Sequence, residues 1–146
     1  IPLIWNSIQE NYKLTLYSED MTRFMIDTEK AIQCIEFALE QSGYTIVPNL
    51  KSFKIKDLFE IYTEEFGLKW EVGVPRISEK IHEQMISPYE ADRATFDKEN
   101  NKYLLHYKKV FAEGKLPESG LSSDKNLVSK TELHQILKEY DYFRRT

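Results

Sequence analysis

The sequence is poor in the residues that cross-link a chain or cradle a phosphate group. It holds one cysteine, Cys34, so no disulfide can form within the chain, which fits a reducing compartment. Its five glycines are scattered, and neither Gly-x-Gly-x-x-Gly nor Gly-x-x-x-x-Gly-Lys-Ser/Thr occurs. Nucleotide binding through either of these glycine-rich loops is therefore excluded for these residues.

Long apolar runs and an excess of positive charge are also missing. No stretch approaches the roughly 20 apolar residues that span a bilayer, and no basic segment followed by an apolar one opens the chain. The formal net charge of −4 lacks the basic excess that is usual in nucleic-acid binders. We expect an intracellular protein, cytoplasmic or nuclear, without a membrane partner. Because the first residue is Ile1 and not Met, we also expect a domain excised from a longer protein.

What is present is typical of a globular domain. The 146 residues are 41% hydrophobic and 30% charged, and a chain of this length buries a core without disulfides. Phe, Trp and Tyr make up 13% of the residues, which predicts an aromatic core. We expect one helical domain that covers residues 1–146.

Helical spacing of apolar residues is the dominant pattern. The predicted helices cover 19–41, 55–66, 88–113 and the stretch after Ser129, with a short helix starting at Ser78. The tetrapeptide 87–90 places a proline at the first helical position inside a Ser-x-x-Glu capping box. The polar run 97–102 leaves open whether that helix breaks near Asn100-Asn101.

Alternating apolar residues at 44–47 and 68–74 predict two short strands, which we expect to pair. The predicted fold class is mainly α, a compact bundle of five or six helices with a small two-stranded β ribbon. The sequence shows no internal repeat.

Few residues carry recognisable chemistry. The three histidines, His82, His106 and His134, stand on separate predicted helices and outside any metal-binding motif, so we expect no metal and no cofactor. Arg76 and His82 have the spacing of an R-x(4–6)-H motif, and they resemble the motif of the HEPN ribonucleases. That resemblance implies phosphate binding by Arg76 and acid–base transfer by His82. The favoured interpretation of these two residues is a helix start with a surface histidine.

A second resemblance covers residues 47–90. Val47-Pro48, the helical stretch 55–62, Gly67, Trp70 and the closing 86–90 follow one another in the order seen in ARIDs, the AT-rich interaction domains of chromatin proteins. The family's glycine pair is a single glycine here, and the stretch from Trp70 to Pro88 is shorter. The resemblance implies a nuclear protein that contacts DNA through its basic loop.

The favoured function is a non-catalytic interaction module that binds a protein partner through exposed aromatic side chains. An ARID-like DNA-binding domain and a small HEPN-like ribonuclease are the two alternatives. The predicted anchors for a protein partner are Trp5, Trp70, Tyr142 and Phe143. The predicted nucleic-acid contacts are Lys51, Lys54 and Lys56, and the catalytic pair of the ribonuclease alternative is Arg76 and His82.

Overall fold

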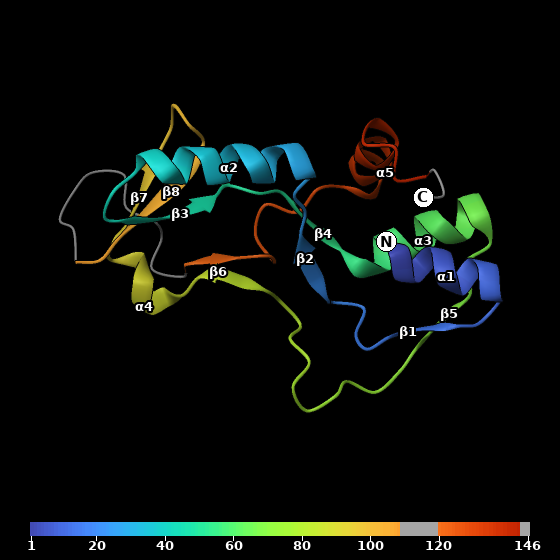
Figure 1. The fold of residues 1–146 in the computed structure, drawn as a ribbon. Helices are drawn as coiled ribbons and strands as arrows, with labels where there is room; N and C mark the ends of the chain where they lie inside the picture. Colours follow the sequence, from blue (N-terminus) through green and yellow to red (C-terminus); the bar gives the residue numbers. More distant parts are fainter. Residues whose placement is uncertain (109–119, 144–146) are drawn as a thin grey trace.

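The computed structural model describes residues 1–108 and 120–143, and it shows a mixed α/β protein (Figure 1). The helices are α1 (Pro2–Glu10), α2 (Thr28–Glu40), α3 (Ile55–Phe66), α4 (Pro88–Ala91) and α5 (Lys130–Glu139). The strands are β1 (Leu14–Leu16), β2 (Thr22–Phe24), β3 (Tyr44–Pro48), β4 (Ser52–Lys54), β5 (Trp70–Val72), β6 (Gln84–Ile86), β7 (Ala94–Asp97), β8 (Lys102–His106) and β9 (Leu121–Ser122). The prediction of a mainly α fold is wrong.

The strands form small sheets. Strands β3, β8 and β7 make a three-stranded antiparallel sheet in that order, with β3 at one edge. Strands β2 and β4 pair antiparallel, as do β6 and β9, whereas β1 and β5 pair parallel. The strand predicted at 44–47 is confirmed, but its pairing with 68–74 is wrong, because alternation identifies a strand and not its neighbour.

The larger core lies where α1, α3 and α5 meet, beside the β1–β5 pair (Figure 1). It is aromatic, as the composition predicts: the ring centroid of Trp5 lies 4.7 Å from that of Phe66 and 5.6 Å from that of Tyr62. The fully buried Tyr62 donates its hydroxyl to the carbonyl oxygen of Tyr142 at 2.8 Å. Burial raises the pKa of Tyr62 to about 12, so this phenol stays neutral in the core.

Two of the predicted helices are confirmed because local signals suffice for them. Helix α3 buries Leu58 and Tyr62 and ends at Gly67, whose φ of 72° favours glycine. Helix α5 begins after Ser129, whose side chain accepts the N–H of Glu132.

The helix predicted at 88–113 is wrong beyond its first turn. The capping box of Ser87 and Glu90 forms, but α4 ends after four residues and the chain continues into the β7–β8 hairpin. The polar run is the hairpin turn: Asp97 accepts the N–H groups of Glu99 and Asn100, and Asn101 adopts a left-handed φ of 52°. Positions 109–113 lie outside the described residues.

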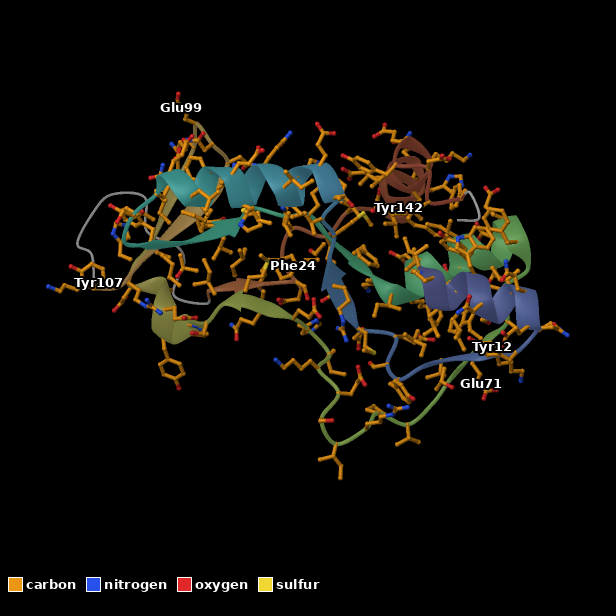
Figure 2. All side chains as sticks on the ribbon, in the orientation of Figure 1. Tyr12, Phe24, Glu71, Glu99, Tyr107 and Tyr142 are labelled. Carbon is orange, nitrogen blue, oxygen red and sulfur yellow. The ribbon has the colours of Figure 1, made fainter. Side chains whose placement is uncertain are left out.

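The helix predicted at 19–41 is also shorter than expected. Residues 22–24 are strand β2, held against β4, and the helix starts only after Asp27, which accepts the N–H of Lys30 at 2.8 Å. The short helix predicted from Ser78 is wrong, since that stretch contains an irregular loop and strand β6. Phe24 lies near the middle of the molecule (Figure 2) and packs against the smaller core, formed by residues of β3, β6, β8 and α4 among others.

Candidate functional site

The loop of residues 73–83 joins β5 to β6 (Figure 1), and its end near β6 lies against β2. At one end, the N–H of Gly73 donates to the carbonyl oxygen of Leu16 at 2.9 Å. Near the other end, the N–H of Thr22 donates to the carbonyl oxygen of Ile81 at 2.9 Å. A side chain on Gly73 would come within 2.4 Å of the Thr15 methyl group, so a larger residue there would require the Thr15 side chain to move.

Arg23 holds the second half of this loop. Its Nη2 lies 3.4 Å from a carboxylate oxygen of Glu79, and its Nε lies 3.4 Å from Glu83. Its Nη1 donates to the carbonyl oxygens of Thr22 at 2.7 Å and Ile81 at 3.3 Å. The Arg23 side chain is 21% exposed, and each nitrogen of its guanidinium group already has a protein partner. Arg23 therefore shapes the loop.

Arg76 is placed differently on the same loop. Its guanidinium carbon lies 4.9 Å from the ring centre of Tyr17, a cation–π arrangement at the surface. The carbonyl oxygen of Arg76 accepts the N–H of Glu79 at 3.0 Å, which closes a tight turn. Within residues 1–108 and 120–143, no carboxylate pairs with Arg76. Its planar N–H donors are thus oriented by the tyrosine ring and available to an anion.

His82 ends the loop and is held by a chain of hydroxyl groups. Its Nδ1 lies 2.9 Å from Thr22 Oγ1, which in turn lies 2.6 Å from Ser123 Oγ. Thr22 and Ser123 are buried, and Ser123 Oγ also accepts the N–H of Glu83 at 2.8 Å. The imidazole is therefore fixed in orientation while the residue stays exposed. Arg76 and His82, paired in the sequence by spacing alone, lie on one loop, and both residues are exposed.

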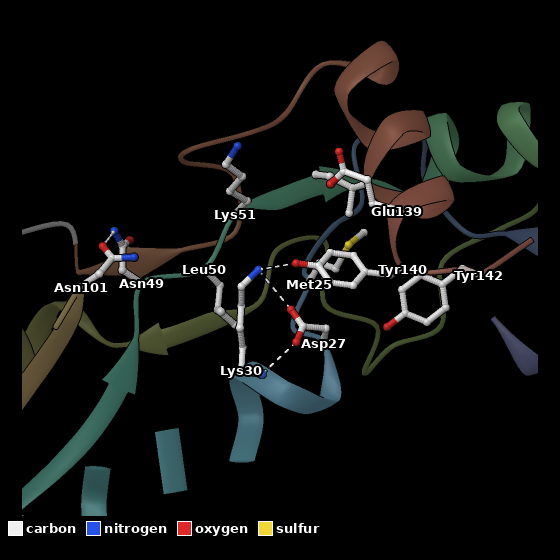
Figure 3. A pocket seen from close by; sticks show the side chains of 11 residues that line it. Met25, Asp27, Lys30, Asn49, Leu50, Lys51, Asn101, Glu139, Tyr140 and Tyr142 are labelled. Atoms are coloured by element: carbon white, nitrogen blue, oxygen red, sulfur yellow. Dashed lines mark hydrogen bonds and ion pairs between the residues drawn. The ribbon is translucent and has the colours of Figure 1, made fainter. Parts of the chain in front are cut away.

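A separate hollow lies between the start of α2, the β3–β4 connection and the end of α5 (Figure 3). It encloses about 320 Å³, and Met25, Leu50 and Ile136 supply its apolar lining. Lys30 Nζ donates to Tyr140 Oη at 2.7 Å and lies 3.1 Å from Asp27 Oδ2.

The hydrogen bonds of this cluster shift two pKa values in opposite directions. The hydrogen bond from the Lys30 backbone lowers the pKa of Asp27, and the hydrogen bond to Tyr140 raises the pKa of Lys30. Both groups are charged at neutral pH, and they largely neutralise each other. Within the described ranges, no group of three or more His, Cys, Asp or Glu side chains could hold a metal ion.

The predicted partner-binding aromatics lie in or against the core. Trp5 is buried and donates its ring N–H to the carbonyl oxygen of Tyr142 at 3.3 Å. Trp70 packs edge-on against Phe59, and Phe143 packs against the Tyr62 ring. These four side chains close the aromatic core, so the structure does not gather them into a surface patch.

The predicted nucleic-acid lysines do not form one positive face either. Lys51 is paired with Glu132, and Lys56 is paired with Glu19 at 2.9 Å. Lys54 is exposed at the end of β4, immediately before α3. Two of the three positive charges are thus matched by carboxylates.

Comparison with known proteins identifies the family. Residues 1–104 match the model of the family described as polysaccharide biosynthesis protein, which is more than half of the chain. The chain belongs to the polysaccharide biosynthesis protein family. It is 27% identical over 159 residues to the UDP-glucose 4-epimerase of Rickettsia akari, covering 99% of this chain and 46% of that protein.

Two further relatives also match over nearly the whole of this chain and about half of their own length. The chain is 26% identical over 153 residues to an uncharacterized membrane protein of Methanocaldococcus jannaschii, which covers 97% of this chain and 45% of that protein. The crystal structure of Pen from Bacillus thuringiensis superimposes with a TM-score of 0.78 at 25% identity, covering 96% of this chain and 45% of that one. The chain therefore spans about half the length of these relatives of the family. Among the helices of the described residues, none has the length and apolar character to cross a bilayer.

Family membership corrects the functional predictions. The ARID resemblance is wrong, and so are the DNA-binding and chromatin readings that it implies, because the match to the polysaccharide biosynthesis family covers the same residues 47–90. The interaction-module and ribonuclease functions are also wrong, since the chain belongs to the polysaccharide biosynthesis protein family and two of its relatives are named UDP-glucose 4-epimerase. The resemblance rested on short motifs around a confirmed helix, α3, which two unrelated folds can share.

Sequence reasoning missed Arg23 and Tyr17 altogether. Arg23 lies within strand β2, a stretch that the sequence assigned to a helix, and Tyr17 directly follows strand β1. Neither residue belongs to a motif. Their role depends on the loop 73–83 lying against β2, a contact between residues more than 50 positions apart. Only the tertiary arrangement contains that signal.

Proposed function

We propose that this chain supplies the nucleotide-sugar-binding part of an enzyme that modifies the sugar of a UDP-linked substrate for polysaccharide biosynthesis. Support comes from the family and from relatives named UDP-glucose 4-epimerase. The observation that carries the proposal is the exposed guanidinium group of Arg76, held over Tyr17 on a loop that Arg23 fastens to β2.

The chemistry of a sugar nucleotide suits this arrangement. Its diphosphate carries negative charge on planar sets of oxygens, which a guanidinium group binds with two parallel hydrogen bonds. Arg76 is the proposed direct contact because no described carboxylate competes for it. Arg23 is a positioning residue, since its donors are already used within the protein.

His82 is the second proposed contact. Thr22 and Ser123 hold the imidazole in place, so little side-chain entropy is lost when the substrate binds. Nδ1 faces Thr22, which leaves Nε2 as the ring atom for hydrogen bonding to a phosphate or sugar oxygen.

The residues of this chain do not fit a dinucleotide cofactor of the kind that an epimerase of this type requires. Its five glycines are separated, and no Gly-x-Gly-x-x-Gly turn opens any of its helices. We therefore assign substrate binding to this chain and no step of the sugar's oxidation or reduction.

Calorimetric titration with UDP, UMP and uridine tests the proposal. UDP is expected to bind more tightly than uridine, and Arg76→Ala is expected to weaken UDP binding by about 10-fold to 100-fold, the worth of a charge-assisted hydrogen bond. Lys98→Ala, which removes a positive charge from the exposed β7–β8 turn, is the matched control and should leave binding unchanged. Equal binding of UDP and uridine, or equal affinity of the Arg76→Ala variant for UDP, would contradict the proposal.

A further inference from the structure

The hydroxyl groups of Thr22 and Ser123 form a short hydrogen-bonding chain behind His82. Thr22 and Ser123 are 1% and 0% exposed, so water has almost no access to them. Ser123 is held twice by one residue, because its N–H donates to the carbonyl oxygen of Glu83 at 2.8 Å and its Oγ accepts the Glu83 N–H at 2.8 Å. The positions of the hydroxyl hydrogens in this chain therefore decide what His82 presents to a ligand.

Each of the two hydroxyl groups has a single hydrogen to donate. Ser123 Oγ lies 3.1 Å from the carbonyl oxygen of Thr22, and since a carbonyl oxygen only accepts, this contact requires the hydrogen of Ser123. The contact of 2.6 Å between Ser123 Oγ and Thr22 Oγ1 then requires the hydrogen of Thr22. Thr22 Oγ1 has no hydrogen left for His82 Nδ1, which lies 2.9 Å away, and is the acceptor there.

This arrangement places a hydrogen on Nδ1 of His82. In a neutral imidazole only one ring nitrogen carries hydrogen, so Nε2 keeps its lone pair. In the opposite arrangement, Thr22 donates to Nδ1 and Ser123 donates to Thr22 Oγ1, which leaves two oxygens 3.1 Å apart with no hydrogen between them. The Thr22 carbonyl oxygen also accepts from Arg23 at 2.7 Å, and its two lone pairs accommodate both donors. Only the first arrangement supplies a hydrogen to every contact of the chain.

We infer that Thr22 and Ser123 are positioning residues that fix His82 in the tautomer with hydrogen on Nδ1, so that Nε2 accepts a hydrogen bond from a hydroxyl group of the substrate sugar. The choice of ligand rests on the proposed function, whereas the tautomer does not. A neutral Nε2 directs a lone pair at the ligand, which is unfavourable beside a diphosphate oxygen and favourable beside a hydroxyl group. The site is thus divided, with Arg76 toward the diphosphate and His82 toward the sugar.

Long-range proton–nitrogen NMR of the isotope-labelled, ligand-free chain tests the tautomer, because a ring nitrogen that carries hydrogen resonates far from one that does not. The spectrum is recorded at about pH 9, where an ordinary imidazole is neutral. The signals of His82 are assigned by their loss in His82→Asn. Hydrogen is expected on Nδ1. Hydrogen on Nε2, or shared equally by the two nitrogens, would overturn the inference.

Ser123→Ala tests how the tautomer is fixed. The substitution frees the hydrogen of Thr22 to bond Nδ1, so the hydrogen of His82 is expected to move to Nε2. Ser42→Ala, which removes an exposed hydroxyl group from the turn before β3, is the matched control and should leave the tautomer unchanged. In Thr22→Val, which keeps the shape of the side chain, hydrogen should no longer be held on Nδ1. Retention of the Nδ1 hydrogen in either folded variant would overturn the positioning role.

Calorimetric titration with UDP and UDP-glucose as probes tests the ligand. UDP-glucose is expected to bind about tenfold more tightly than UDP, the worth of one hydrogen bond, and His82→Ala should reduce this difference to less than about twofold. Equal binding of the two probes by the natural chain, or an undiminished difference in His82→Ala, would overturn the sugar contact and leave the proposed function in place. Absence of UDP binding would overturn the proposed function and the sugar contact together.

Discussion

Helices α2 and α5 are built alike and placed differently. Both are capped by a side chain, Asp27 for α2 and Ser129 for α5, and both carry an apolar stripe. In α5, Leu133 and Leu137 are fully buried against the aromatic core. In α2, the stripe is formed by Ile32, Ile35 and Leu39, which are 51%, 62% and 83% exposed. The same pattern therefore predicts a helix with an apolar face in both cases, and says nothing of whether its partner lies within the chain.

The molecule therefore has one region whose apolar and polar groups find partners within the chain, and one region that leaves apolar side chains exposed. The region of α1, α3 and α5 satisfies its polar groups internally, as the bonds from Trp5 and Tyr62 to the carbonyl oxygen of Tyr142 show. The region of α2 and β3 leaves both a stripe and a strand edge without partners among the described residues. We expect substitutions to affect the isolated chain strongly in the first region and weakly in the second.

The largest effect is expected from Leu133→Ala. The side chain is fully buried in the aromatic core, so its removal should lower the free energy of unfolding by about 2–5 kcal/mol. Urea denaturation followed by circular dichroism measures this value. A loss below about 1 kcal/mol would show that the region of α1, α3 and α5 is not closely packed around α5.

A smaller effect is expected where α2 begins. Asp27→Ala should lower the free energy of unfolding by about 0.5–2 kcal/mol at pH 7, because the first turn of α2 loses the acceptor for the Lys30 N–H. The pKa of Asp27 is lowered in the folded protein. Its charge therefore stabilises the fold above the unfolded pKa of about 3.9, and this contribution disappears as pH falls through the lower folded pKa.

Urea denaturation of both proteins between pH 7 and pH 2 checks this dependence. The stability difference between the natural chain and Asp27→Ala should shrink at the acid end. Asp27→Asn is the matched control, since an amide oxygen still caps the helix but carries no charge. A difference that is constant over this range would show that the charge of Asp27 contributes nothing.

The smallest effect is expected from Leu39→Ala. With 83% of its surface exposed, Leu39 loses few contacts, and the free energy of unfolding of the isolated chain should change by less than about 0.5 kcal/mol. Urea denaturation measures this value. A loss above about 1 kcal/mol would remove the contrast between α2 and α5.

Part of the fold could be predicted from local signals. Helix α3 with its stop at Gly67, helix α5 with its cap at Ser129, and the capping box at Ser87 were all predicted and are present. Each depends on hydrogen bonds between residues at most five positions apart. Of the candidate site, only Arg76 and His82 were singled out, and the ribonuclease function that their spacing suggested was wrong.

Local signals could not predict which strands pair, to which family the chain belongs, or that Arg23 holds the loop 73–83. The stretch 88–113 has a helical apolar pattern after its polar middle, yet residues 102–106 form β8, because pairing with both β3 and β7 outweighs local preference. The loop 73–83 has no regular pattern, and its place beside β2 depends on contacts such as that of Arg23 with Glu79.

The sequence by itself determined the caps at Ser87 and Ser129, the end of α3 at Gly67, and that the core is aromatic, because these features arise from neighbouring residues and from composition. The tertiary structure alone decided which strands pair, that Arg23 fastens the loop bearing Arg76, and that the stripe of α2 is left exposed. These features arise between residues far apart in the chain, whose contacts are fixed only when the whole chain has packed.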